Sequence, residues 1–293
     1  MRGLRWLLLL LVVAGIGIAF FLLRPVTGAP RDLTLVGDAE RGAYLMRLSG
    51  CVACHTDAAN GVATLAGGPA LASPFGTFYA PNITPDPDHG IGRWTLAEFS
   101  RAMSDGEGPQ GHLYPAFPYE NYTLMSDQEI ADLFAAVLAV PAAATPSRPH
   151  ELGFPFDQRL ALSAWKNLFF APARYQADPA QSEQWNRGRY LVFGPGHCVA
   201  CHSPRNALGA IEGGRELAGN PGGGAGGRAP ALTRAALVAA DYDTATLASA
   251  LADGFTPGFD ILGGPMGEVI EEGTSHWTAE DREAVAAYLL EAQ

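Results

Sequence analysis

The sequence predicts an all-α fold with two similar helical domains that follow an N-terminal apolar helix. Three observations predict it: an uncharged apolar run at residues 6–23, one sequence pattern that occurs twice, and helical periodicity with little strand alternation. The 35 glycines and 22 prolines fit long loops packed on a bound group. We expect an anchor or signal at 1–28, domains at 35–140 and 181–293, and a linker at 141–180.

The N-terminal segment has the composition of a membrane span. Its apolar run, Trp6–Leu23, is flanked by Arg2, Arg5 and Arg24. The run is longer than a usual signal-peptide core and close to the length that crosses a bilayer, so we favour an uncleaved anchor. Residues 27–29 are a weak cleavage site, so a removed signal remains the alternative. Arginines before the span favour a cytoplasmic N-terminus, with the rest of the chain in a bacterial periplasm.

The charge balance limits the kinds of partner. The chain has 19 basic and 30 acidic residues, which gives a formal charge of −11, and Lys166 is its single lysine. Nucleic-acid binding needs clustered lysine and arginine, so we expect no nucleic-acid partner. The acidity permits docking onto a basic protein surface, although it can equally serve solubility alone.

The four cysteines form two copies of one motif. Cys51 and Cys54 precede His55, and Cys198 and Cys201 precede His202, each time as Cys-Val-Ala-Cys-His. This spacing attaches a c-type haem, because two thiols bind the vinyl groups and the histidine reaches the iron. Two copies in an exported chain without another cysteine disfavour a redox dithiol, a zinc site or disulfides. We therefore expect two covalently bound haem c groups, with His55 and His202 as proximal ligands.

The motif copies belong to a longer internal repeat, which predicts the helices of each domain. Related Arg-Gly-x-Tyr-Leu segments precede the two motifs, at 41–45 and 187–191. Amphipathic stretches at 96–104 and 245–252 each end at an Asp-Gly pair. The last helices, 126–139 and 278–291, start at candidate N-caps, Ser126 and Thr278, with acidic residues in the first turn.

The second haem has an expected distal ligand in Met266. This methionine ends the Gly-Gly-Pro-Met segment between the second and third helical stretches of its domain. Methionine–histidine ligation raises the potential of a haem, which suits an electron carrier. A methionine in a loop rich in glycine and proline is less easily explained as a core residue.

The first haem lacks that ligand, because the repeat places Phe117 at the position of Met266. We favour Met125, just before the last helix of the domain, as its distal ligand. His112, Met103 and a five-coordinate iron remain alternatives. A carbonyl that holds the other ring nitrogen of each proximal histidine is expected from Pro69 and Pro230.

The stretch between the domains divides into two parts. Residues 141–149 contain three prolines and three alanines, as in an exposed connection. Residues 159–170 predict a short helix with an aromatic cluster, which we expect to pack across both domains.

These motifs resemble the cytochrome c subunit of bacterial membrane-bound alcohol, gluconate and aldehyde dehydrogenases, over residues 37–292. The resemblance is carried by residues 51–56 (CVACHT), 74–76 (PFG), 81–86 (PNITPD), 90–94 (GIGRW), 112–116 (HLYPA) and 196–206 (GHCVACHSPRN). It implies tandem class I cytochrome c domains that pass electrons from a dehydrogenase catalytic subunit to ubiquinone or a terminal oxidase. Familiar members differ in carrying three haems, and often a methionine where Phe117 stands.

We therefore expect a membrane-anchored, periplasmic dihaem cytochrome c that does no substrate chemistry. Its donor would be a dehydrogenase, and its acceptor an oxidase, a quinone or a soluble cytochrome. The alternative is a dihaem redox enzyme, of the peroxidase or thiosulfate-oxidising type, that uses an open first haem. Missing acid–base groups near Phe117 speak against that alternative.

Overall fold

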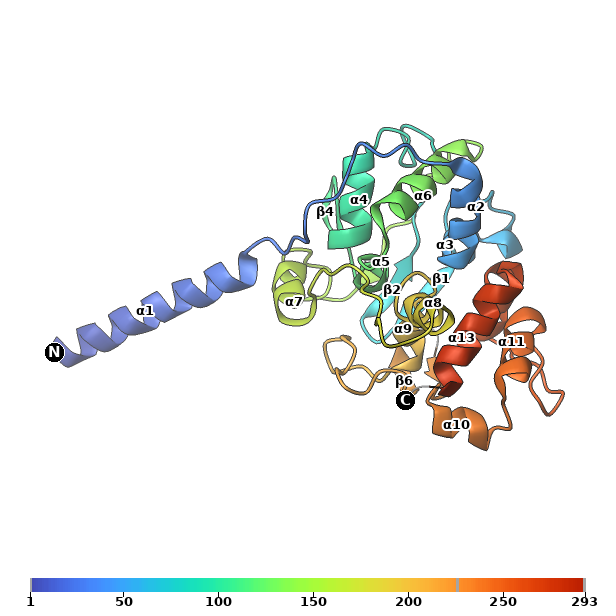
Figure 1. The fold of residues 1–293 in the computed structure, drawn as a ribbon. Coiled ribbons are helices and arrows are strands. Elements are labelled where there is room, and N and C mark those ends of the chain that lie inside the picture. Colours follow the sequence, from blue (N-terminus) through green and yellow to red (C-terminus); the bar gives the residue numbers. More distant parts are fainter. Residues whose placement is uncertain (1, 225–226, 292–293) are drawn as a thin grey trace.

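The computed structural model describes residues 2–224 and 227–291, and most of its regular structure is helical (Figure 1). The longer helices are α1 (Arg2–Leu23), α2 (Ala39–Leu48), α4 (Leu96–Asp105), α6 (Asp127–Ala139), α7 (Ala161–Phe169), α8 (Glu183–Phe193), α11 (Thr244–Asp253) and α13 (Ala279–Glu291). The shorter ones are α3 (Cys51–His55), α5 (Tyr119–Tyr122), α9 (Cys198–His202), α10 (Arg234–Ala239) and α12 (Pro265–Glu272), with 3-10 turns at Ala58–Asn60 and Thr274–His276.

In the first half of the chain, α2 packs against α6. The Asp38 side chain caps α2, and Ser126 with Glu129 forms a capping box on α6, which confirms Ser126 as the predicted N-cap. The two helices meet at Gly42, where an added Cβ would lie 1.9 Å from the carbonyl oxygen of Asp132. Only glycine allows this close approach of the two backbones.

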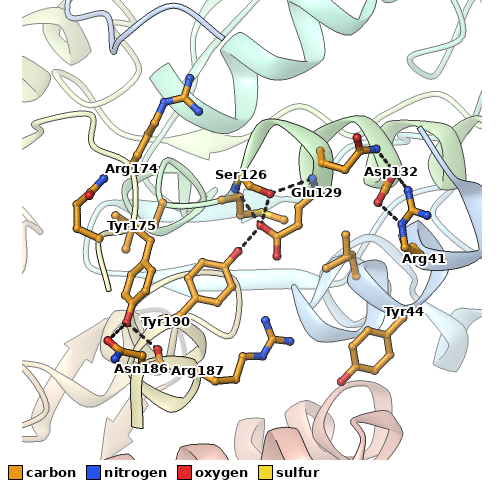
Figure 2. Close-up of a pocket in the computed structure, with 15 residues that line it drawn as sticks. Arg41, Tyr44, Ser126, Glu129, Asp132, Arg174, Tyr175, Asn186, Arg187 and Tyr190 are labelled. Atoms are coloured by element: carbon orange, nitrogen blue, oxygen red, sulfur yellow. Dashed lines mark hydrogen bonds and ion pairs between the residues drawn. The ribbon is translucent and has the colours of Figure 1, made fainter. Parts of the chain in front are cut away.

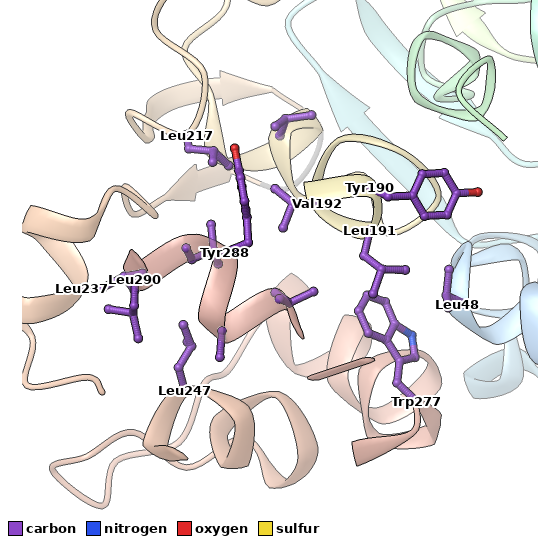
Figure 3. Close-up of a cluster of buried hydrophobic side chains, with 14 residues drawn as sticks. Leu48, Tyr190, Leu191, Val192, Leu217, Leu237, Leu247, Trp277, Tyr288 and Leu290 are labelled. Carbon is purple, nitrogen blue, oxygen red and sulfur yellow. The ribbon is translucent and has the colours of Figure 1, made fainter. Parts of the chain in front are cut away.

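In the second half, α8 and α13 repeat the same crossing. A Cβ on Gly188 would lie 1.9 Å from the carbonyl oxygen of Ala284. The Thr278 hydroxyl accepts from the amide of Asp281 at 3.2 Å, as expected of an N-cap. The apolar cluster of this half also takes in Leu48 from α2, which lies near Trp277 in Figure 3. The two halves therefore share a core.

Short strands, which the sequence did not predict, occupy the long loops. They are β1 (Ala70–Ser73), β2 (Gly76–Tyr79), β3 (Glu107–Gly108), β4 (Gly111–His112), β5 (Glu151–Leu152), β6 (Asn220–Gly224) and β7 (Gly227–Ala229). They form an antiparallel sheet, β1-β2-β5, and two hairpins, β3-β4 and β6-β7. Strands of two to five residues are too short to produce a visible alternation of polar and apolar residues.

Helix α7 packs on both halves, as the aromatic cluster in the linker predicted. The Trp165 indole donates to the carbonyl of Leu208 in the second half at 2.9 Å. The Lys166 ammonium donates to the carbonyls of Asp105 and Gly106 in the first half, both at 2.7 Å. The linker therefore fixes the two halves to one another.

Helix α1 projects away from the body (Figure 1). Residues Gly3–Leu23 have a mean hydropathy of 2.9, and none of this span is buried. By length and composition it is the one helix in the described part of the chain that could cross a membrane. The extended segment after it runs along the first half, where the Arg31 guanidinium pairs with Asp127 at 3.1 Å.

Candidate haem sites

The two motif copies form matching short helices, α3 and α9. Each begins after a residue at positive φ, Gly50 at 67° and His197 at 39°. In each, the first cysteine is half-buried, the second is exposed, and neither is in a disulfide. The structure therefore presents two thiols and one histidine together at each site, as covalent haem attachment requires.

The two histidine rings have the same orientation. The Nδ1 atom of His55 lies 2.7 Å from the carbonyl oxygen of Pro81, and that of His202 lies 2.7 Å from the carbonyl oxygen of Pro230. A carbonyl only accepts, so the proton of each neutral ring sits on Nδ1 and leaves a lone pair on Nε2. Burial lowers the pKa of both histidines, opposed by these hydrogen bonds, which favours the neutral form that binds a metal.

The predicted carbonyl partner of the proximal histidine is confirmed at Pro230 for His202 and is wrong at Pro69 for His55. The β1-β2 hairpin follows Pro69, and its base is closed by the amide of Gly68 donating to the carbonyl of Ala80 at 3.0 Å. The chain returns to the histidine only after this hairpin, so Pro81 supplies the carbonyl. In the second half, β6-β7 precedes Pro230 in the same way.

The loops after the two motifs repeat in detail. The amide of Gly67 donates to the carbonyl of His55 at 3.0 Å, and the amide of Gly219 donates to the carbonyl of His202 at 2.8 Å. The loops are therefore pinned to the histidines at matching points, which extends the internal repeat from sequence to hydrogen bonding.

The distal sides differ between the halves. Met266 lies in the first turn of α12 and is half-buried, whereas the sequence placed it in a loop. Its counterpart Phe117 is partly buried against the apolar cluster of the first half. We call this the first core cluster: Leu45, Met46, Val52, Leu65, Ile91, Phe99, Met103, Tyr122, Met125, Ile130, Leu133, Ala136 and Val137. At the position just before the last helix of each half, the methionine is instead in the first half: Met125 there corresponds to Trp277 in the second half. In each half, therefore, one of these two repeat positions is a methionine and the other is an aromatic residue.

The three residues predicted as candidates for the first distal position are two buried methionines and one histidine. Met125 and Met103 are both fully buried in the first core cluster. The Nδ1 atom of His112 lies 3.2 Å from the Lys166 ammonium. An ammonium only donates, so His112 Nδ1 accepts and the ring proton sits on Nε2, the opposite of the arrangement at His55. This tautomer leaves His112 without a free nitrogen for a metal.

The residues that precede the two attachment helices, Gly50 and His197, lie close together. A Cβ on Gly50 would lie 3.2 Å from the Nε2 atom of His197, and the His197 ring stands edge-to-face to Tyr122 at 5.8 Å. The Tyr122 hydroxyl donates to the carbonyl of Ser49 at 2.6 Å. The two sites therefore adjoin one another.

Reciprocal hydrogen bonds hold the halves in this arrangement. The Tyr44 hydroxyl donates to Asp281 at 2.6 Å, and its counterpart Tyr190 donates to Glu129 at 2.7 Å. Arg187 binds both oxygens of Asp281 at 2.7 Å. Figure 2 shows Tyr190 pointing to Glu129. Both residues line a cleft of about 800 Å³ between the halves. Each tyrosine bond crosses between the halves, so their relative position is specified twice.

Unpaired polar atoms test whether a haem fits these sites. Among the described residues, five buried side-chain atoms have no hydrogen-bond partner: Ser49 Oγ, Tyr119 Oη, Trp185 Nε1, Thr274 Oγ1 and Trp277 Nε1. Two of them, in Ser49 and Trp277, lie beside the attachment motifs. Ser49 lies two residues before Cys51, and Trp277 lies against Gly196, whose added Cβ would be 2.8 Å from its ring. Buried donors normally have acceptors, and the carboxylates of a haem are acceptors of the needed kind. The residues present therefore fit the group that the motifs predict.

Comparisons with known proteins agree with this assignment. The family model for cytochrome c matches residues 39–139. The chain is 43% identical to "Diheme cytochrome c-type" of Cereibacter sphaeroides, across 98% of this chain and 97% of that protein. It is 42% identical to a nicotinate dehydrogenase subunit of Pseudomonas putida and 37% identical to the cytochrome c subunit of a quinone-dependent alcohol dehydrogenase of Gluconacetobacter polyoxogenes, in each case across 85% of this chain. It spans 21% and 55% of the lengths of these two relatives.

Proposed function

Because this chain belongs to the cytochrome c family and carries two haem c groups, we propose that it is a membrane-anchored, periplasmic relay from a dehydrogenase to the respiratory chain. Its relatives include cytochrome subunits of alcohol and fructose dehydrogenases, which supports a dehydrogenase as donor and a role without substrate chemistry of its own. The acceptor would be an oxidase, a quinone or a soluble cytochrome.

The proposed ligand sets follow the repeat. Cys51 and Cys54 would attach the first haem, with His55 as proximal ligand and Met125 as distal ligand. The second haem would be attached by the matching residues of its own half, Cys198, Cys201, His202 and Met266. Haem iron supplies one-electron redox chemistry, and the chain supplies ligands, burial and orientation. The Pro81 carbonyl would hold the proton on His55 Nδ1, and so keep Nε2 available.

One observation carries the relay proposal: the residues that precede the two attachment helices, Gly50 and His197, lie against one another. Two separate carriers would have no need for adjoining sites, whereas a relay depends on a short and fixed gap. The reciprocal tyrosine bonds and α7 keep this gap from opening.

We expect His197→Ala to slow electron transfer between the haems about tenfold, because rates that depend on fixed geometry fall steeply when the reacting groups move by an ångström. The measurement is the rate of haem-to-haem equilibration after photoreduction of the full-length protein. His150→Ala is the matched control, since His150 is also half-buried but its ring packs on Phe78 and Tyr114 of the first half. Equal rates in both variants and the parent protein would count against a role for His197.

The proposed anchor is supported by contacts that a cleaved chain would lose. Asn167 of α7 donates to the carbonyl of Arg24 at 2.9 Å, and the Arg24 guanidinium donates to the Asn167 side chain at 2.7 Å. Val26 packs against the cluster of Trp165 and Phe170. Cleavage after Ala29 would remove both groups of contacts.

We therefore expect the mature protein to keep residues before Pro30. The intact mass of the protein extracted from bacterial membranes, corrected for two haems, measures this directly. A mass that places the N-terminus at Pro30 would show instead that the segment is a removed signal.

A further inference from the structure

Helix α7 has an unusual distribution of residues for the surface of a water-soluble domain. Its inner face carries Lys166, which is 1% exposed. Its outer face carries Leu168, which is 56% exposed, in line with the exposed Ala161 and the half-buried Ala164. A solvated helix normally turns its charged residues outward. Here the outward face has no charge, and the single lysine points inward.

The orientation of α7 is fixed by that lysine. Its ammonium donates to the carbonyls of Asp105 and Gly106 at the C-terminal end of α4 and contacts His112. Burial lowers the pKa of Lys166 to about 8. These bonds would be broken if α7 rotated, so the apolar residues on its outer face are held outward.

Further exposed apolar side chains lie in the segment that leads into α7 and in the loop that Trp165 contacts. Phe154 is 83% exposed and Leu160 is 67% exposed in the segment that leads into α7. Phe156 is also exposed, and so is Leu208, whose carbonyl accepts from Trp165. We call these side chains the α7 patch: Phe154, Phe156, Leu160, Leu168 and Leu208. Several large apolar side chains gathered at one place on a surface indicate an interaction site.

The α7 patch adjoins the end of α1. The Asn167 amide donates to the carbonyls of Leu22 and Arg24, and Leu168 is the next residue. Figure 1 shows α7 where α1 meets the body. If α1 spans a bilayer, its C-terminal end lies at the membrane surface, and α7 lies there with it.

We propose that the α7 patch rests in the interfacial layer of the membrane and thereby fixes how the haem domains face the lipid surface. The inference rests on the proposed anchoring by α1 and goes beyond it, because a single span leaves the body free to tilt. An apolar helix face beside a span buries itself at the boundary of headgroups and acyl chains. Asp157 and Arg159, which are exposed within the same segment and opposite in charge, would stay among the headgroups.

Site-directed spin labels in the full-length, haem-loaded protein in phospholipid vesicles test this. The four native cysteines are expected to be bound to haem, so an added cysteine is the reactive thiol. The patch variants are Leu160→Cys and Leu168→Cys. The lipid reference is Val13→Cys in α1, and the aqueous control is Val238→Cys on α10, where Val238 is 54% exposed. Accessibility to oxygen reports lipid, and accessibility to a water-soluble nickel chelate reports water.

We expect the labels at residues 160 and 168 to resemble the label at residue 13. For both, the ratio of oxygen accessibility to chelate accessibility is expected to be at least tenfold higher than for the label at residue 238. Patch labels in water with the Val13 label in lipid would overturn the inference and leave the anchor intact. A Val13 label in water would overturn the anchor and, with it, the inference. Protection of residue 168 only after the co-purifying dehydrogenase is added would show a protein-docking surface instead.

Discussion

Replacing Met125 with leucine is expected to convert the first haem to a high-spin state that binds added carbon monoxide. The second haem is expected to stay low-spin, so half of the haem in the protein changes. Leucine keeps nearly the volume of methionine, so the core is expected to lose less than about 1.5 kcal/mol of stability. It lacks the thioether sulfur, so the iron would lose its distal ligand. Electron paramagnetic resonance and carbon monoxide titration measure the fraction of haem that changes.

Two variants make this prediction specific. Met103→Leu is the matched control, because Met103 is equally buried in the same core cluster but lies inside α4. It is expected to leave both haems low-spin. Met266→Leu is expected to convert the other haem, so that the double variant with Met125→Leu is fully high-spin. An unchanged spectrum in Met125→Leu would return the first distal position to the remaining alternatives.

Replacing Gly42 with alanine is expected to destabilise the first half by about 3 kcal/mol or more, at the upper end of overpacking costs. The added Cβ would lie 1.9 Å from the carbonyl oxygen of Asp132 and 2.7 Å from the Cβ of Ala136. Backbone cannot yield there as a flexible side chain would, so α2 and α6 must move apart. Guanidinium unfolding of the haem-loaded protein, followed by circular dichroism, measures the change.

The repeat supplies an internal comparison for this prediction. Gly188→Ala makes the same clash with Ala284 and is expected to cost a similar amount in the second half. Gly213→Ala is the control, because its added Cβ meets nothing within 4 Å. Its effect is expected to stay within about 0.5 kcal/mol. Equal stabilities for Gly42→Ala and Gly213→Ala would show that the crossing in solution is wider.

Helices with strong local signals could be predicted from the sequence. The α6 helix begins at its capping box on Ser126, and α4 ends at Gly106, in both cases as the pattern indicated. The motif cysteines and histidines were equally readable, because their chemistry depends on local spacing. The β1-β2 hairpin was not readable, since its strands are short, and this is why Pro69 was chosen in place of Pro81.

The sequence predicted that the linker packs on both halves, but not which residues make the contacts, because these join residues far apart in sequence. The bond from Tyr44 to Asp281 spans 237 positions, and the buried end of Lys166 finds its partners 61 and 60 positions away. His197 did leave a signal: it occupies the position before the motif where the first half has Gly50. A histidine at a repeat position where the other half has glycine suggests that its side chain makes a contact. The sequence does not show that the partner is Gly50 itself.

The central claim is that electrons from a dehydrogenase enter and cross the two haems of this chain. The most direct measurement is to isolate the full-length protein from its membrane with the dehydrogenase that co-purifies, to add the substrate of that dehydrogenase, and to follow both haem absorption bands by stopped flow. We expect both haems to become reduced, and both to be reoxidised when an oxidase, a quinone or a soluble cytochrome is supplied. Haems that stay oxidised while the dehydrogenase turns over with an artificial acceptor would contradict this claim.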